Sequence, residues 1–214
     1  CFALGLVAWA ANAQAQSAAP GAAAKPAPAT VTILFDGSGS MWGKLDNERQ
    51  SKLALARDAI RNILPALHQE ARVGLASYGH RRPADCSDVQ VIQAPEKLDA
   101  ERINGPLEKL NPKGKGPVAA GLKEAAKSLA GITGARSIVL IHDDVDNCQQ
   151  DVCAAATEIA QQQPGVQIHV ISMGLRKEDA ARMMCVANAT KGRFVDAQNA
   201  GQIASGIEDA LKLA

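Results

Sequence analysis

The chain has 214 residues, 47% of them apolar, which is enough for one α/β domain with a full core. Its formal net charge of +1 gives no basis for binding nucleic acid or a strongly charged membrane surface. Aromatic residues make up only 3%, too few for base-stacking platforms. The composition therefore indicates a globular protein with no nucleic-acid partner.

The N-terminal segment has the composition of a targeting sequence. Residues 1–10 form an apolar run, and small-residue cleavage sites follow it. This pattern is typical of the later part of a secretory signal peptide, so we expect residues 1–15 to be removed by cleavage after Ala13 or Ala15. The run is too short to cross a bilayer, and we expect no transmembrane segment in the mature chain. These features predict a periplasmic or secreted protein.

The next residues, 16–29, are rich in Ala and Pro and predict a semi-extended linker. The folded domain is predicted over residues 30–214, where apolar runs alternate with segments of helical periodicity. Strands are predicted at 31–35, 72–78, 89–92, 137–141, 166–171 and 193–195. Helices are predicted at 52–67, 99–110, 118–129, 152–162, 177–188 and 200–213, the second of them broken at Gly105-Pro106.

Alternating strands and helices indicate an α/β fold with a doubly wound, mostly parallel sheet and helices on both faces. Segment 89–92 is the expected exception, an antiparallel edge strand that forms a hairpin with 72–78.

Four cysteines follow Cys1, namely Cys86, Cys148, Cys153 and Cys185. An even number in an exported protein indicates two disulfides, and three pairings are open. A zinc site is the alternative, but there is no CxxC pair and the spacing is irregular.

Short oxygen-bearing side chains follow two of the predicted strands. Asp36, Ser38 and Ser40 come after the first strand, within Asp-Gly-Ser-Gly-Ser, and Asp143 and Asp144 follow the fourth. Such runs are often only turns. In a doubly wound sheet, however, these strand ends can share the crevice at the switch point, where ligands bind. Carboxylates and hydroxyls are suitable ligands for Mg²⁺ or Mn²⁺.

At this point the sequence resembles the von Willebrand factor A family. Asp36-Gly37-Ser38-Gly39-Ser40 matches the D-x-S-x-S signature of its metal-ion-dependent adhesion site, and the order of elements matches from about residue 30 to 214. Exported bacterial members of the family are similar in further segments. These are Met41-Trp42-Gly43, Tyr78-Gly79-His80-Arg81-Arg82, Cys148 with Cys153, and Cys185 with the segment 187–193.

The resemblance implies that Asp36, Ser38, Ser40 and Asp143 hold a divalent metal, to which Asp144 could add a carboxylate. Two positions depart from the family pattern. Gly116, before Pro117, stands where the family usually has a metal-site Thr, and Asp144 stands where a Gly usually follows the acidic residue. Because Gly116 supplies no hydroxyl, we expect weak metal binding.

The implied activity is recognition rather than catalysis, with an Asp or Glu of a protein partner completing the metal site. A partly basic rim of His80, Arg81, Arg82, Lys113 and Lys115, beside Gly116, would favour an acidic ligand; ordinary solvated loop charge is the alternative for each residue. Of the other residues, we expect His142 and His169 to be structural, Met183 and Met184 to fill the core, and Trp42 either to pack or to contact a partner. Element positions favour Cys153–Cys185 and Cys86–Cys148 as the disulfides.

Other functions fit the motifs less well. A Mg²⁺-dependent phosphatase with Asp36 as nucleophile would need a second Asp at position 38, where Ser38 stands. A serine hydrolase lacks its G-x-S-x-G motif, and Trp42 occupies the third glycine of a dinucleotide-binding turn. A metal-free interaction scaffold remains open because of Gly116.

Overall fold

The computed structural model describes residues 28–213, so the predicted signal peptide and most of the predicted linker lie outside the described residues. The strands are β1 (Thr30–Asp36), β2 (Arg72–Tyr78), β3 (Val89–Lys97), β4 (Arg136–His142), β5 (Val166–Met173) and β6 (Phe194–Ala197). The helices are α1 (Lys52–Ile63), α2 (Ala100–Lys109), α3 (Val118–Ser128), α4 (Val152–Gln162), α5 (Lys177–Ala189) and α6 (Ala200–Leu213), with 3-10 turns η1 (Gly39–Trp42) and η2 (Leu64–Ala66).

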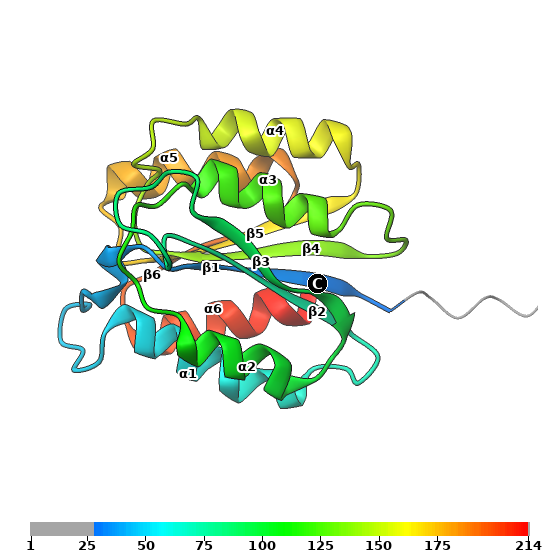
Figure 1. Ribbon diagram of the computed structural model, residues 1–214, viewed down its shortest axis with the longest axis horizontal. Coiled ribbons are helices and arrows are strands. Elements are labelled where there is room, and N and C mark those ends of the chain that lie inside the picture. Colours follow the sequence, from blue (N-terminus) through cyan, green and yellow to red (C-terminus); the bar gives the residue numbers. More distant parts are fainter. Residues whose placement is uncertain (1–27, 214) are drawn as a thin grey trace, which may run out of the picture.

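One six-stranded sheet, in the order β3-β2-β1-β4-β5-β6, runs through the centre of the molecule. All neighbouring strands are parallel except β2 and β3, which form an antiparallel hairpin at one edge. Figure 1 shows α1, α2 and α6 on one face of the sheet and α3, α4 and α5 on the other. The predicted fold class is therefore confirmed.

Each face of the sheet has its own apolar core. Phe35 and Ile33 of β1 pack in the core beneath α1, α2 and α6, whereas Leu34 packs in the core beneath α3, α4 and α5. Because consecutive residues of a strand point to opposite faces, an almost continuous apolar run is what a doubly covered strand needs. No helix among the described residues has the length and hydrophobicity needed to span a membrane.

Two predicted elements differ from the structure. Helix α2 continues through Gly105-Pro106, because Ile103 and Leu107 are buried on the same face and this packing outweighs the hydrogen bond lost at proline. The edge strand β3 extends to Lys97 and includes Pro95, which an edge strand tolerates since it has no further neighbour on one side.

The sheet order places β1 and β4 side by side although they are about a hundred residues apart in sequence. Phe35 pairs with Ile141, so Asp36 and Asp143 both lie just beyond the paired residues, at the carboxyl ends of their strands. The chain leaves β1 toward β2 on one side, and β4 and β5 continue the sheet on the other, which makes this the switch point.

Gly79, which follows β2, provides a test of the loop packing around this switch point. Its φ is +69°, and a Cβ there would lie 2.2 Å from the carbonyl oxygen of Lys115. We expect Gly79→Ala to lower the free energy of unfolding by more than about 2 kcal/mol in urea titrations. The matched control is Gly105→Ala in α2, where a Cβ meets nothing within 4 Å, and we expect it to stabilise by about 0.5–1 kcal/mol. Wild-type stability in Gly79→Ala would contradict the packing described.

Candidate functional site

The Asp-Gly-Ser-Gly-Ser segment forms a tight turn after β1. The backbone N–H of Ser38 donates to Asp36 Oδ1 at 2.7 Å, and that of Gly37 donates to the carbonyl oxygen of Tyr78 at 2.8 Å. A Cβ on Gly37 would lie only 2.6 Å from that same oxygen, so the close approach to β2 requires glycine. The turn directs Ser38 and Ser40 toward the end of β4.

Four of the five predicted metal ligands lie in one cluster of oxygen atoms. The hydroxyls of Ser38 and Ser40 are 2.9 Å apart, and the Ser40 hydroxyl donates to Asp143 Oδ1 at 2.7 Å. Asp36, Ser38 and Asp143 are almost completely buried, while Ser40 is exposed. We call Asp36, Ser38, Ser40 and Asp143 the oxygen cluster; it opens to solvent at Ser40.

The fifth predicted ligand, Asp144, lies apart from the hydrogen bonds of this cluster. Its Oδ1 accepts the backbone N–H of Val145 at 2.8 Å, and its carbonyl oxygen lies 2.9 Å from His142 Nδ1. The carboxylate of Asp144 therefore stabilises its own loop.

Lys52, the first residue of α1, also belongs to the site, and the sequence analysis did not identify it. Its Nζ lies 3.0 Å from Asp143 Oδ2, and only 14% of its side chain is exposed. A cation in the first turn of a helix is unfavourable beside the positive end of the helix dipole. That local misfit was the available sequence signal, since it indicates that Lys52 has an anionic partner elsewhere.

Burial and like charge disfavour ionisation of Asp36. Burial, followed by the nearby charge of Asp143, raises the pKa of Asp36 to about 7, although hydrogen bonds from Ser38 oppose the rise. Burial and the charge of Asp36 raise the pKa of Tyr78 well above its usual value. The Tyr78 hydroxyl is buried near Asp36 and opposes the rise in its pKa. It makes no well-formed hydrogen bond with any described residue. A cation in the cluster would relieve the repulsion between the two carboxylates.

The donor set fits a small hard cation. No group of three or more His, Cys, Asp or Glu side chains within residues 28–213 is arranged to hold a metal. A divalent ion in the cluster would therefore be coordinated by two carboxylates, two hydroxyls and water. Mg²⁺ suits such a site because it readily retains several waters.

Gly116 lies directly against the oxygen cluster. Its N–H donates to Asn147 Oδ1 at 2.9 Å, and a Cβ there would lie 3.9 Å from Ser38 Oγ, an ordinary contact distance. A Cβ at this position would therefore meet no clash, and a side chain there would begin beside Ser38. Asn147, which holds this loop, was another residue that the sequence analysis did not single out.

Most of the predicted basic rim is engaged within the β2–β3 loop. Arg81 Nε donates to the buried Asp88 at 2.6 Å, and the backbone N–H groups of Arg81 and Arg82 also donate to that carboxylate. These hydrogen bonds outweigh the effect of burial and lower the pKa of Asp88. His80 is itself buried, which lowers its pKa and favours the neutral ring. The three residues support the loop.

Two lysines and a tryptophan remain at the surface near the cluster. Lys113 and Lys115 are exposed, and no side-chain ion pair of theirs is seen among the described residues. Trp42 is 54% exposed, and its Nε1–H donates to the carbonyl oxygen of Pro112 at 2.8 Å. The indole is thus fixed in place while about half of it stays exposed to solvent.

Both disulfides follow the pairing that the element positions favoured. Cys86–Cys148 joins the β2–β3 loop to the β4–α4 loop, and Cys153–Cys185 joins α4 to α5. The first bridge connects the two loops on either side of the cluster.

The remaining predictions are mostly confirmed. His142 is buried, with Nε2 2.6 Å from the Ser172 hydroxyl, and His169 Nδ1 accepts the N–H of Arg193 at 3.2 Å. Met183 is in the core, but the prediction for Met184 is wrong, because it is 44% exposed on the outer side of α5.

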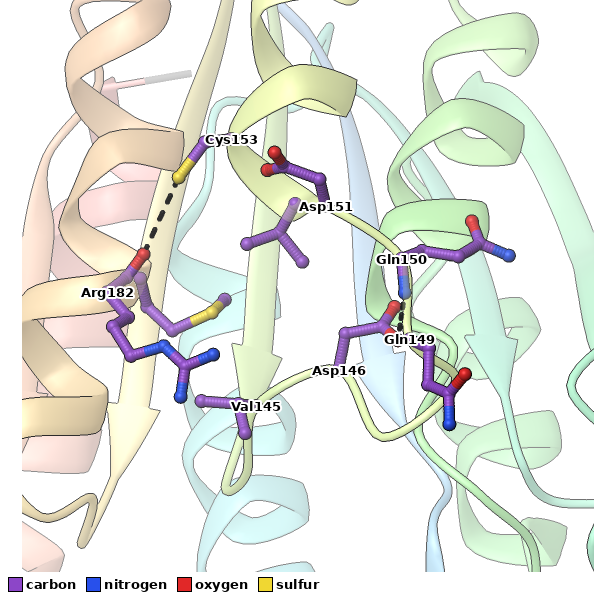
Figure 2. Close-up of a pocket in the computed structure, with 9 residues that line it drawn as sticks. Val145, Asp146, Gln149, Gln150, Asp151, Cys153 and Arg182 are labelled. Atoms are coloured by element: carbon purple, nitrogen blue, oxygen red, sulfur yellow. Dashed lines mark hydrogen bonds between the residues drawn. The ribbon is translucent and has the colours of Figure 1, made fainter.

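A cavity of about 500 Å³ lies between the β4–α4 loop and α5. Figure 2 shows Val145, Asp146, Gln149 and Arg182 around it. Asp146 is committed to the protein: its carboxylate accepts the N–H groups of Ala119 at 3.0 Å and Cys148 at 2.8 Å. The oxygen cluster, and not this cavity, contains the buried carboxylate pair.

Comparison with known proteins identifies the family. Residues 30–209 match the von Willebrand factor type A domain, so the chain belongs to this family. Two uncharacterized proteins of Bacillus subtilis (strain 168) are similar in sequence. YwmD is 25% identical over 190 residues, which cover 85% of this chain and 84% of YwmD, and YwmC is 22% identical over 180 residues, which cover 80% and 78%.

Solved structures with the same fold share little sequence with the chain. The PilB minor pilin from Streptococcus sanguinis, as a D319A mutant, superposes with a TM-score of 0.70 at 16% identity, over 89% of this chain and 62% of the pilin. Proximal thread matrix protein 1 from the mussel byssus, with a zinc-occupied MIDAS motif, has a TM-score of 0.67 at 16% identity, over 88% of this chain and 46% of that protein. The chain thus spans less than two thirds of either structure.

The raised pKa of Asp36 predicts that the free energy of unfolding depends on pH when a chelator keeps the protein free of metal. Because the folded pKa of about 7 exceeds the unfolded value of 3.8, the folded state binds more protons between these values, and stability falls as pH rises from about 4 to 7. Asp36→Asn should remove this loss and raise the free energy of unfolding at pH 8 by up to a few kcal/mol. Urea titrations at pH 5 and 8 measure the free energy of unfolding of both proteins. If it changed equally with pH in the wild type and in Asp36→Asn, the prediction would be wrong.

The Cys86–Cys148 bridge closes a separation of 62 residues in sequence. We expect the Cys86→Ser/Cys148→Ser double variant to lose about 2–4 kcal/mol of unfolding free energy. Hydrogen exchange should increase in the β2–β3 and β4–α4 loops around the cluster. The matched control, Cys153→Ser/Cys185→Ser, should leave exchange in the β2–β3 loop unchanged. Equal exchange in both variants would show that the first bridge does not order these loops.

Proposed function

We propose that this domain is an exported protein-binding module that recognises an acidic group through a divalent ion, Mg²⁺ or Mn²⁺, held by Asp36, Ser38, Ser40 and Asp143. The observation that carries the proposal is the convergence of two buried carboxylates and two hydroxyls at the switch point, with the pKa of Asp36 raised to about 7. Buried carboxylates in this state favour an added cation. A bound divalent ion would offer an open coordination position to an Asp or Glu of the partner.

The protein's own groups have separate roles in this proposal. Asp36 supplies a buried carboxyl group that the Ser38 N–H orients, and the Ser40 hydroxyl links Ser38 to Asp143. Lys115, exposed next to Gly116, contributes positive charge near an incoming carboxylate. The exposed indole of Trp42, fixed by its hydrogen bond to Pro112, offers an apolar contact to the partner. Together they favour a partner whose acidic residue has an apolar neighbour.

Export and the absence of catalysis are part of the proposal. Two disulfides are typical of an oxidising compartment, as expected for a periplasmic or secreted domain. We infer that the domain is not an enzyme, because Ser38 stands where a phosphatase of the type considered needs its second carboxylate. Protein recognition also agrees with the pilin among the structures that share the fold, although at 16% identity the likeness concerns the fold alone.

A metal-free interaction scaffold is the second candidate, and two observations favour it. Gly116 contributes no hydroxyl to the cluster, and Lys52 already supplies a positive charge to Asp143. In this case partners would bind the same surface without a divalent ion, and binding would not respond to chelators.

Calorimetric titration with Mg²⁺ and Mn²⁺ separates the two candidates. We expect the wild type to bind Mn²⁺ weakly and Asp36→Ala to lose binding, because it removes the buried carboxylate. Gly116→Thr should bind about tenfold more tightly, because its hydroxyl would lie beside Ser38. The matched control is Asp144→Asn, which alters a neighbouring carboxylate outside the cluster and should bind like the wild type. Binding by Gly116→Thr alone would favour the metal-free scaffold.

A further inference from the structure

Lys52 stands out because it places a positive charge of the protein itself against the oxygen cluster. Both oxygens of Asp143 are engaged by protein groups: Oδ1 accepts the Ser40 hydroxyl at 2.7 Å, and Oδ2 lies 3.0 Å from Lys52 Nζ. The Asp143 side chain has no exposed surface, and that of Lys52 is 14% exposed. A buried carboxylate held in this way is compensated without any metal.

The position of Lys52 is costly for its helix. It is the first residue of α1, directly after the N-cap Ser51, whose hydroxyl accepts the N–H of Ala54. An ammonium at that end is repelled by the helix dipole. At the start of a helix an acidic or neutral residue would be more favourable. The ion pair with Asp143 offsets this cost of placing an ammonium there.

Lys52 also has space into which it can move. It lines a cavity of about 390 Å³ together with Asp46, Glu48 and Lys44, and no residue of the oxygen cluster lines this cavity. Glu48 is partly committed, because its Oε1 accepts the N–H of Ala200 at 2.8 Å, whereas Asp46 is exposed. The long, flexible lysine side chain therefore has beside it a cavity that two other carboxylates also line.

We propose that Lys52 is a tethered cation that competes with divalent metal for Asp143. In the metal-free protein, Lys52 neutralises Asp143 and holds its carboxylate in place. When a divalent ion is bound, Lys52 withdraws from Asp143 into the cavity lined by Asp46 and Glu48. Lys52 thereby sets a low metal affinity. This inference rests on the metal-binding form of the proposed function.

The test compares Mn²⁺ binding in Lys52→Met and Lys52→Gln with the wild type. Both variants remove the charge, and glutamine keeps a hydrogen-bond donor on a side chain one bond shorter than lysine. We expect both to bind Mn²⁺ on the order of tenfold more tightly, because a like charge has been removed from the site. Lys44→Met is the matched control: it lines the same cavity and should change the affinity less than about twofold.

Thermal unfolding provides a second readout. In chelator, Lys52→Met should melt below the wild type, since it leaves Asp143 buried without a countercharge. Saturating Mn²⁺ should raise its melting temperature by more than it raises that of the wild type. Lys44→Met should behave like the wild type in both conditions.

The outcomes separate this inference from the proposed function. If the wild type binds Mn²⁺ and neither Lys52 variant binds more tightly, Lys52 only positions Asp143, and the inference is wrong while the proposed function stands. If only the Lys52 variants bind, the competition is supported and the natural protein is metal-free. If no protein binds Mn²⁺ at millimolar concentration, both ideas are wrong.

Discussion

The repulsion between two carboxylates, buried together where β1 and β4 end, is the constraint on which the rest of the site depends. Asp36 and Asp143 come from segments about a hundred residues apart, and only the parallel pairing of their strands brings them together. Two negative charges out of water are unstable together unless something compensates them. The two carboxyl groups avoid this in different ways. Burial and the charge of Asp143 raise the pKa of Asp36 to about 7, which favours its neutral form. Asp143 is paired with Lys52 and accepts a hydrogen bond from Ser40.

The surrounding loops hold this unfavourable arrangement by close backbone contacts and covalent links. Gly37 brings the turn against Tyr78, and the N–H of Gly114 donates to the carbonyl oxygen of Gly79 at 2.7 Å. The Cys86–Cys148 disulfide ties the β2–β3 loop to the β4–α4 loop. Arg81 forms an ion pair with Asp88 inside the β2–β3 loop. A cation in a loop next to the oxygen cluster therefore need not face the cluster.

The sequence predicts the fold well because the fold depends on periodic patterns. Nearly continuous apolar strands such as β1 and capped amphipathic helices such as α4 are local signals, and α4 lies at the predicted residues. The break expected at Pro106 failed because burial of Ile103 and Leu107 is a tertiary effect. Met184 failed for a different reason: it follows the buried Met183 in the sequence but lies one step further around α5, where its side chain is 44% exposed.

The site was predictable only where a motif carries it. The D-x-S-x-S turn and Asp143 lie at strand ends, and parallel strands bring such ends together. Lys52 is at a helix start and meets the cluster only through packing. Tyr78 is the last residue of β2 and meets Asp36 because the two residues are paired between β1 and β2. Asp144 was expected as a ligand because it follows Asp143. Adjacent side chains after a strand diverge, however, and its carboxylate turned to the N–H of Val145.

Gly116 and Lys52 act on the cluster in the same direction although they come from different elements. The glycine withholds an oxygen next to Ser38, and the lysine adds a positive charge at Asp143. A missing neutral oxygen would reduce the number of ligands available to a metal ion. An added positive charge acts at longer range and would weaken the binding of any cation in the cluster. The first effect depends on the coordination chemistry of the ion, and the second depends mainly on its charge. For this reason Mg²⁺ and Mn²⁺ should respond similarly to loss of Lys52 and differently to a hydroxyl restored at position 116.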